Sequence, residues 1–339
     1  MKDGISMKEG VKLMNQPLVS IIIPTHNRPE LLMRAVKSAV AQSYQNTEII
    51  VVDDVGNVPI DELKKLSDKI QYIRIPPTIW TAENRNAGIK AAKGKYIAGL
   101  DDDDIWFDYY LDTLIPVMES DDSIGMACSN GYIINDINEK PIRTMFPHIQ
   151  TELRGNLFSK MIWECFTQPS VMIIRKNMFD TVGLFHNIRA EDLDIIMRIS
   201  AFTNIYYTPK TCAVWYRRLD ISSRTSLDQS TLQGRLENLF SAINCLVDIE
   251  LMAGRYGRKF SLSEKCAMFF QKYYFSCYIV AVHFMFKSPD RYSVLIDCIL
   301  DYPLLFPITL LTPLCCNKTI RDVGQELKRK MAVFFNHSG

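Results

Sequence analysis

Hydrophobic and polar positions follow two alternating patterns over the first hundred residues of the chain. Apolar residues recur at helical spacing in three segments, at residues 29–40, 61–66 and 82–92. A continuous apolar run of strand length, rich in β-branched residues, stands at 18–24, and further strands are expected around these segments at 48–52, 70–75 and 95–100. This alternation predicts an α/β fold, with a mainly parallel central sheet and helices on both of its faces.

The pattern becomes less regular after residue 100. We expect helices near 109–119 and at 191–201, and a helical region from about residue 231 onward. Shorter apolar runs predict further strands, whereas residues 141–166 show no regular period. These strands are expected at 126–128, 132–134, 170–174, 205–207 and 212–216. A chain of 339 residues is long enough for about two domains.

Composition excludes several classes of protein. The chain has 39 Lys and Arg against 38 Asp and Glu, and 47% of its residues are hydrophobic. This composition excludes intrinsic disorder, and it lacks the basic excess of a dedicated nucleic-acid binder, so no nucleic-acid partner is expected. The nine cysteines are scattered without metal-ligand spacing, which predicts reduced thiols in a cytoplasmic protein. Residues 1–16 have no apolar core typical of a signal peptide.

Several motifs of nucleotide and ester chemistry are absent from the sequence. It has no G-x-x-x-x-G-K-[ST], no G-x-G-x-x-G and no G-x-S-x-G. The absence argues against a P-loop NTPase, a standard dinucleotide enzyme and an α/β-hydrolase. The five histidines show no paired spacing, which argues against zinc hydrolysis.

Polar side chains follow three of the four N-terminal strands. Thr25-His26-Asn27 follows the first strand, Asp53-Asp54 the second, and an aspartate run at residues 101–104 the fourth. The carboxyl ends of parallel strands meet at one edge of a sheet, where ligands bind. We therefore expect these groups to converge on a single site.

The carboxylates of this edge have two interpretations each. The run at 101–104 is either a solvated acidic turn or a site for Mg²⁺ or Mn²⁺, and its position at the end of a buried strand favours the metal. Asp53-Asp54 is either a turn or a ligand for a nucleobase or ribose. Glu191-Asp192 is either an acidic first turn of a helix or the location of a general base. Arg85 either lies on a solvated helix face or belongs to the candidate site.

Taken together, these segments resemble the family 2 inverting glycosyltransferases of the GT-A fold, which is a Rossmann-like nucleotide-binding fold. The resemblance covers about residues 17–218. Within the family, this segment is most similar to bacterial enzymes that build O-antigen, capsule or other surface polysaccharides. The strings that carry it are VSIIIPTHNRPELLMRAVKSAVAQSY, EIIVVDD, ENRNAGIKAAKGKYIAGLDDDDIW and AEDLDIIMR.

The resemblance implies a role for each group. In the family pattern, Asp101-x-Asp103 is the D-x-D motif, with Asp103 and Asp101 as metal ligands for Mn²⁺ or Mg²⁺. Asp192 is the catalytic base and Glu191 supports it. The remaining residues bind the nucleotide-sugar: Pro24, Thr25, Asn27, Asp53, Asp54, Arg85, Asp101 and Asp102. Val55-Gly56 replaces the small pair common after the two aspartates, which leaves open whether Asp53 or Asp54 contacts the nucleotide.

The resemblance also implies a reaction and its partners. An acceptor hydroxyl attacks the anomeric carbon of a nucleotide-sugar, expected to be a UDP-sugar, while Asp192 takes its proton. The expected acceptor is a glycan or lipid-linked oligosaccharide. The implied domains are an N-terminal extension (1–16), a GT-A catalytic domain (17–225) and a helical region (226–339). Two alternatives stay open, a metal-dependent nucleotidyltransferase and a non-catalytic nucleotide- or sugar-binding protein.

The C-terminal third lies outside the resemblance and differs in charge. Residues 231–339 hold 13 Lys and Arg against 9 Asp and Glu, a net of +4, whereas residues 1–230 have a net of −3. Uncharged runs at 273–286 and 302–317 are shorter than the roughly 20 residues of a membrane span. Two interpretations remain, a helical subdomain packed on the core and a peripheral contact with the inner face of the cell membrane.

Overall fold

The computed structural model of the chain describes residues 16–135, 140–217 and 232–272. The chain forms two compact units. The first consists of residues 1–156 and 167–219, and the second of residues 157–166 and 220–339. The domain boundary expected at residue 225 and the extension expected at 1–16 lie almost entirely outside the described residues and stay predictions.

The first unit is built on a mixed sheet whose N-terminal part is parallel, as predicted. Its order is β3-β2-β1-β4-β9-β6-β10-β5, with β7 paired to β6 and β8 to β10. The first four strands in the chain are the predicted ones: β1 (Val19–Thr25), β2 (Thr47–Asp53), β3 (Ile70–Arg74) and β4 (Tyr96–Gly99). They pair in parallel, and Thr25 stands opposite Asp53 in the register of β1 and β2. The polar residues that follow β1 and β2 therefore lie side by side.

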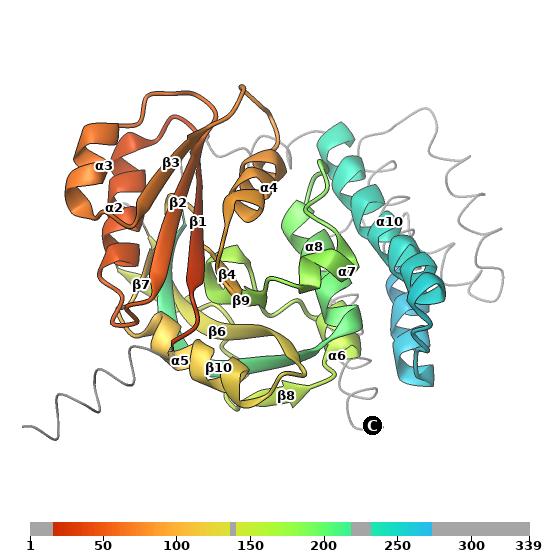
Figure 1. Cartoon of the computed structure of the whole chain (residues 1–339). Coiled ribbons are helices and arrows are strands. Elements are labelled where there is room, and N and C mark those ends of the chain that lie inside the picture. The colour runs from red at the N-terminus through yellow and green to blue at the C-terminus, as the bar shows by residue number, and fades with distance from the viewer. Residues whose placement is uncertain (1–15, 136–139, 218–231, 273–339) are drawn as a thin grey trace, which may run out of the picture. The chain divides into compact units, whose positions relative to one another are not determined.

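Helices cover both faces of these strands (Figure 1). The helices are α2 (Pro29–Val40), α3 (Ile60–Leu66) and α4 (Thr81–Ala91). Pro29 begins α2 with a backbone angle suited to the first helical turn. Its buried side, including Leu32 and Val36, belongs to the same apolar core as Ile21 and Ile23 of β1. Each such burial stabilises the fold by about 1.5–3 kcal/mol.

Helix α4 approaches the opposite face of β1 closely because it carries Gly88. A Cβ atom added there would lie 2.4 Å from Ile22 Cγ2, so a larger residue would push the helix away. Arg85, one turn earlier on α4, is thereby held beside the carboxyl end of the sheet.

The remaining strands differ from the expected pattern in length and direction. They are β5 (Ile105–Trp106), β6 (Ile124–Asn135), β7 (Pro141–Thr144), β8 (Leu153–Gly155), β9 (Met172–Arg175) and β10 (Asn204–Arg217). The two short strands predicted at 126–134 form one strand, β6, and the two predicted at 205–216 form β10, whose pairing with β6 shifts register near Thr208. β9 joins β4 and β6 in antiparallel fashion, so the sheet is mixed beyond β4. Residues 141–166 also hold regular elements, although the sequence shows no period there.

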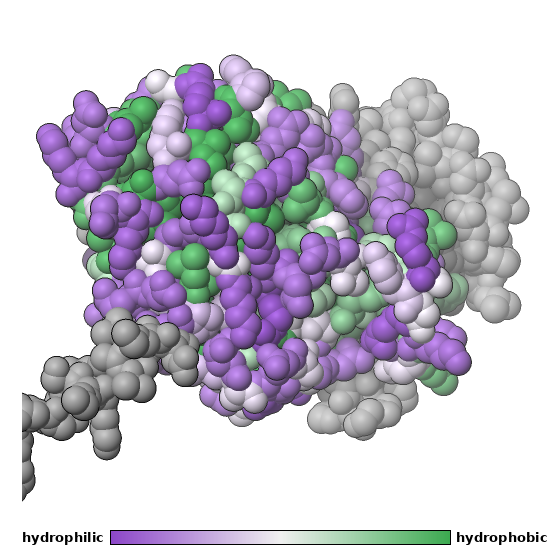
Figure 2. Space-filling model, viewed as in Figure 1, coloured by the Kyte–Doolittle hydropathy of each residue, from purple (hydrophilic) through white to green (hydrophobic). Residues whose placement is uncertain are grey.

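Short helices complete the first unit. They are α5 (Tyr110–Ser120), the 3-10 turn η1 (Pro169–Val171), α7 (Met178–Val182) and α8 (Glu191–Phe202). The predicted helix at 191–201 is therefore confirmed. On the face shown in Figure 2, hydrophilic residues dominate the visible surface of the described part, while the apolar strand residues are buried.

The described part of the second unit is helical. It contains α6 (Phe158–Trp163), α10 (Leu232–Tyr256) and a helical segment at 262–272. Phe158 of α6 stacks on Phe260, with ring centroids 5.6 Å apart. Within residues 16–135, 140–217 and 232–272, no helix has both the length and the apolar character needed to cross a bilayer. The uncharged runs at 273–286 and 302–317 lie outside these residues.

Candidate active site

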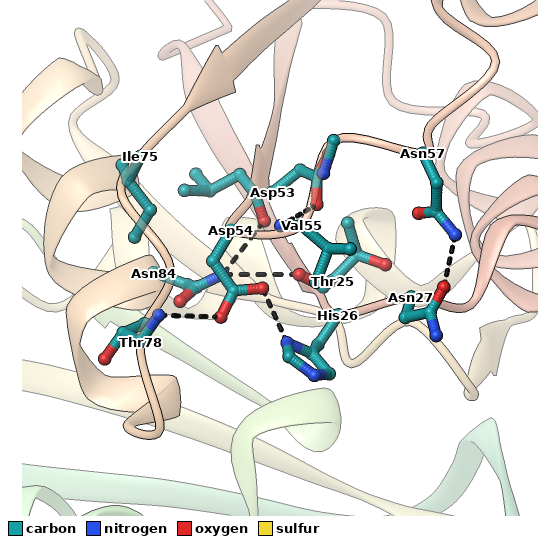
Figure 3. A network of polar contacts seen from close by, with 12 residues as sticks. Thr25, His26, Asn27, Asp53, Asp54, Val55, Asn57, Ile75, Thr78 and Asn84 are labelled. Carbon is teal, nitrogen blue, oxygen red and sulfur yellow. Dashed lines mark hydrogen bonds and ion pairs between the residues drawn. The ribbon is translucent and has the colours of Figure 1, made fainter.

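Two adjacent aspartates at the end of β2 are both buried but have different partners. Asp53 accepts hydrogen bonds from the backbone N–H groups of Val55 and Gly56, each at 2.8 Å, and from the Tyr72 hydroxyl at 2.8 Å. Its carboxylate thus holds the turn after β2. Asp54 instead contacts His26 on the neighbouring loop, with Oδ1 2.8 Å from the His26 Nδ1 atom (Figure 3).

The loop that follows β1 lies against these aspartates (Figure 3). Pro24 and Thr25 end the buried strand, and Asn84 of α4 donates to the carbonyl oxygens of Thr25 and Val52, each at 3.3 Å. Asn27 adopts a left-handed backbone with φ of 53°, and its side-chain oxygen accepts a hydrogen bond from Asn57. A non-glycine residue in this region is uncommon outside tight turns. The predicted nucleotide-binding residues of β1 and β2 therefore share one edge.

The four consecutive aspartates after β4 divide into a partly exposed pair and a buried pair. The side chains of Asp101 and Asp103 are 33% and 22% exposed, whereas Asp102 and Asp104 are buried. The Thr25 hydroxyl donates to Asp102 Oδ2 at 2.8 Å, which ties this loop to β1. The arrangement brings the predicted D-x-D residues beside the predicted nucleotide edge.

Burial changes the acidity of the two inner aspartates. Loss of solvation raises the pKa of Asp102 to about 6, although Arg28 and the Thr25 hydroxyl act in the opposite direction. Burial, together with the charges of Asp103 and Asp101, raises the pKa of Asp104 well above its ordinary value. Burial therefore disfavours the charged form of the two inner carboxyl groups.

Arg85 joins the aspartate loop to the first turn of α8. Its Nη2 donates to Asp101 Oδ1 at 2.5 Å and its Nη1 donates to Glu191 Oε1 at 2.9 Å. Burial by itself lowers the pKa of Arg85. The charges of Asp101, Glu191 and Asp192 raise that pKa by more than burial lowers it, so Arg85 stays a cation. Burial raises the pKa of Glu191, and Asp192 adds to that effect while Arg85 opposes it.

The helix that carries Glu191 and Asp192 begins in a strained conformation. Ala190, which precedes it, has a left-handed backbone with φ of 56°. Asp192 accepts a hydrogen bond from the Leu193 N–H at 2.8 Å. Strain of this kind persists only where the surroundings hold it, and it concentrates at functional sites.

The sequence places His26 among the polar residues of this edge without giving it a partner, and it does not single out Arg28. Arg28 donates to Asp102 and Asp103, and His26 contacts Asp54. Both stand in the loop directly after the first strand, within four residues of Thr25, and that position was the available signal. Among the described residues, no three His, Cys, Asp or Glu side chains are grouped so as to hold a metal ion by themselves.

Comparison with known proteins identifies the fold and family. Residues 20–183 match the family model described as glycosyl transferase family 2. This part of the chain belongs to glycosyl transferase family 2. The family 2 segment covers β1 to β9 and all the site residues described above except Glu191 and Asp192. The predicted family is thus confirmed.

Relatives of the family 2 segment are bacterial glycosyltransferases by name. An uncharacterized glycosyltransferase of Rickettsia bellii is 30% identical over 203 residues, which are 56% of this chain and 27% of that protein. The putative colanic acid biosynthesis glycosyl transferase WcaA of Escherichia coli K12 is 41% identical over 99 residues, 28% of this chain and 35% of WcaA. The match therefore spans about a quarter to a third of these relatives.

A further bacterial relative and a solved structure are also similar to this chain. The Escherichia coli UDP-Glc:alpha-D-GlcNAc-diphosphoundecaprenol beta-1,3-glucosyltransferase WfaP is 38% identical over 121 residues, 35% of this chain and 48% of WfaP. The crystal structure of S. aureus TarS 1-349 in complex with UDP-GlcNAc matches with a TM-score of 0.54 at 16% identity, and covers 85% of this chain and 90% of that one. This likeness confirms the predicted GT-A fold class.

Proposed function

We propose that the protein is an inverting glycosyltransferase that moves a sugar from a UDP-sugar to a hydroxyl of a growing, lipid-linked bacterial surface glycan. The observation that carries the proposal is the Arg85 bridge, which links Asp101 to Glu191. The Arg85 guanidinium thereby holds Asp101, a proposed donor-binding carboxylate, close to the carboxylates at the start of α8. A nucleotide- or sugar-binding module has no need for a base at that position.

The nucleotide edge supports the choice of donor. Asp53 is occupied by its own turn and by Tyr72, so Asp54 is the better candidate for hydrogen bonds to the base or ribose. The structurally similar TarS was solved with UDP-GlcNAc. We infer that a uridine nucleotide binds along Thr25, Asn27 and Asp54.

The donor set of the aspartate loop fits Mn²⁺ or Mg²⁺. Asp101 and Asp103 are the exposed members of the run, and carboxylate oxygens are the ligands these cations prefer. Since these two carboxylates alone do not surround a cation, donor phosphates and water would complete its coordination. A bound cation would supply electrostatic stabilisation of the departing diphosphate.

The first turn of α8 supplies the proton transfer in this proposal. Asp192 accepts the proton of the acceptor hydroxyl as that oxygen attacks the anomeric carbon. Glu191, fixed by Arg85, orients the turn. The acceptor class is inferred from relatives such as WfaP, whose name specifies a diphosphoundecaprenol-linked substrate.

Release of UDP from UDP-glucose, UDP-galactose and their N-acetyl forms, with Mn²⁺ or with EDTA, tests this function. We expect release with one donor and a lipid-linked acceptor, and its loss with EDTA. The Asp192→Asn variant is expected to lose turnover by about two to four orders of magnitude while UDP binding persists. Asp68→Asn, an exposed aspartate, is the control. Wild-type turnover by Asp192→Asn would contradict the assignment of the base.

A further inference from the structure

Arg28 stands between the nucleotide edge and the aspartate loop. Its Nη1 atom lies 3.2 Å from Asp102 Oδ1 and 3.0 Å from Asp103 Oδ2, so one nitrogen serves two carboxylates. The backbone of Arg28 is fixed, because its carbonyl oxygen accepts the first hydrogen bond of α2 from the Leu32 N–H at 3.0 Å. The Arg28 side chain therefore extends to the two carboxylates from a backbone that the helix holds in place.

Arg28 and Arg85 are bound in different ways. The Arg85 side chain is 9% exposed, is held by Asp101 of the aspartate loop and by Glu191 of α8, and lies over the Phe185 ring at 5.6 Å. The Arg28 side chain is 28% exposed, and its ion pairs come from the aspartate loop alone. Arg85 is therefore a fixed bridge, whereas Arg28 can exchange partners at low cost.

The ion pairs of Arg28 involve the carboxylates that a divalent cation would use. A cation bound at Asp103 would repel the guanidinium and take over the charge that Arg28 now neutralises. A guanidinium has five donors in a planar fork that matches phosphate oxygens. The ligand that brings a diphosphate to this edge would give Arg28 a new partner at the same moment.

We propose that Arg28 is a charge-exchange residue, which holds Asp102 and Asp103 in the donor-free protein and moves to the diphosphate of the donor when a divalent cation binds Asp103. This inference rests on the proposed function, because it requires a nucleoside diphosphate and a cation at this site. Arg28 competes with the cation before the donor arrives and assists the donor afterwards. Loss of the Arg28 side chain should therefore strengthen the binding of the cation alone and weaken the binding of the nucleoside diphosphate.

Calorimetric titration of the full chain with Mn²⁺ alone, and with UDP or GDP in the presence of Mn²⁺, separates these effects. In Arg28→Met we expect Mn²⁺ alone to bind about two- to fivefold more tightly, because a partly exposed ion pair has been removed. UDP is expected to bind about tenfold to hundredfold more weakly, because a charge-assisted hydrogen bond is lost. Uridine, which has no phosphate, should bind both proteins alike.

Arg34→Met is the matched control, since Arg34 is an exposed residue of α2 whose guanidinium lies over the Tyr216 ring, 4.2 Å from its centroid. It should change none of the three affinities. Weaker binding of both Mn²⁺ and UDP by Arg28→Met would show a merely structural role and overturn the inference, as would no change in either. Failure of the wild-type protein to bind either nucleotide would count against the proposed function instead.

Discussion

Asp53 and Asp54 show how two identical neighbouring residues acquire different roles. The Asp53 carboxylate accepts hydrogen bonds from two backbone N–H groups of its own turn and from the Tyr72 hydroxyl of β3, so both of its oxygens have partners within the fold. Asp54 pairs with His26, whose side chain is 49% exposed. Asp53 therefore supports the fold, whereas Asp54 is the aspartate to which the proposed function assigns the nucleotide.

Substitution separates the two roles. Asp53→Asn places an amide where two N–H donors point, and we expect it to lower the free energy of unfolding by about 1–3 kcal/mol. Asp54→Asn should change stability by less than about 1 kcal/mol and weaken UDP binding about tenfold, the cost of one charge-assisted hydrogen bond. Urea unfolding and calorimetry of both variants measure these effects. Equal losses of stability would contradict the assignment.

The raised pKa of Asp102 predicts a dependence of stability on pH. Its pKa is 3.8 in an unfolded chain and about 6 here, chiefly because it is buried. The folded protein thus holds this proton between pH 4 and 6 when the unfolded chain has lost it, and the contribution of Asp102 to stability falls as the pH rises through that window.

Asp102→Asn removes this titration. The variant should gain in stability relative to wild type by up to about 3 kcal/mol between about pH 4 and pH 7, since it carries no buried charge. Urea unfolding at both pH values measures the difference, and UDP binding should weaken in the same variant. Asp68→Asn, whose side chain is exposed, is expected to show no such change. A pH-independent difference for Asp102→Asn would refute this prediction.

The residues of the site could be found from the sequence where a motif marks them. The aspartate run and Glu191-Asp192 stand at the ends of predicted elements, so topology alone brings the first of them to the sheet edge. Arg28 and His26 could not be assigned in this way, because their partners are 74–75 and 28 residues away in the chain. Only the folded loops determine which side chain meets which carboxylate.

At the scale of elements, the loop between α7 and α8 is held from two sides. Arg198 of α8 is fully buried and donates to the carbonyl oxygens of Val182 and Leu184 and to Asp194. Asn86 of α4 accepts from the Phe185 N–H at 2.9 Å and donates to the Phe185 carbonyl at 2.8 Å. These contacts fix the segment that leads into Asp192.

Asn86→Ala should loosen that segment without altering the nucleotide edge. Removal of two hydrogen bonds to buried backbone groups costs about 1–3 kcal/mol of local stability. Hydrogen exchange of residues 182–190 should therefore quicken about tenfold or more, while UDP binding changes less than about twofold. Asn187→Ala, which removes an exposed hydrogen bond to Glu83, is the control. Unchanged exchange in Asn86→Ala would show that the loop is held by other means.

The predicted elements were reliable where local periodicity is strong. All four N-terminal strands and α8 are present, because strand-length segments rich in apolar residues and a clear helical period mark them. The halves of β6 and β10 were separated in the prediction because polar residues interrupt the apolar pattern, at Ser129-Asn130 and at Thr208. Ladder pairing between strands distant in sequence joins them, and no local pattern contains that information.

At the scale of the whole molecule, the N-terminal and C-terminal parts of the chain carry net charges of opposite sign. Residues 1–230 have a net charge of −3 and carry the proposed active site, and residues 231–339 have a net charge of +4. Five basic residues near the C-terminus lie outside the described part of the chain: Lys318, Arg321, Lys328, Arg329 and Lys330. They remain the sequence-based argument for a peripheral contact with anionic lipid.

A lipid-linked acceptor would place its reactive hydroxyl close to a membrane surface, and this gives the basic segment a testable role. Each Lys or Arg near an anionic surface contributes about 1 kcal/mol to binding, so replacement of all five by Gln should abolish flotation of the full chain with vesicles rich in anionic lipid. Five lysines of the first unit, replaced in the same way, form the control: Lys37, Lys64, Lys65, Lys69 and Lys93. High salt should reduce binding by the wild type. Absence of flotation by the wild-type protein, or equal loss in the control, would exclude the membrane contact and favour a helical region that packs only on protein.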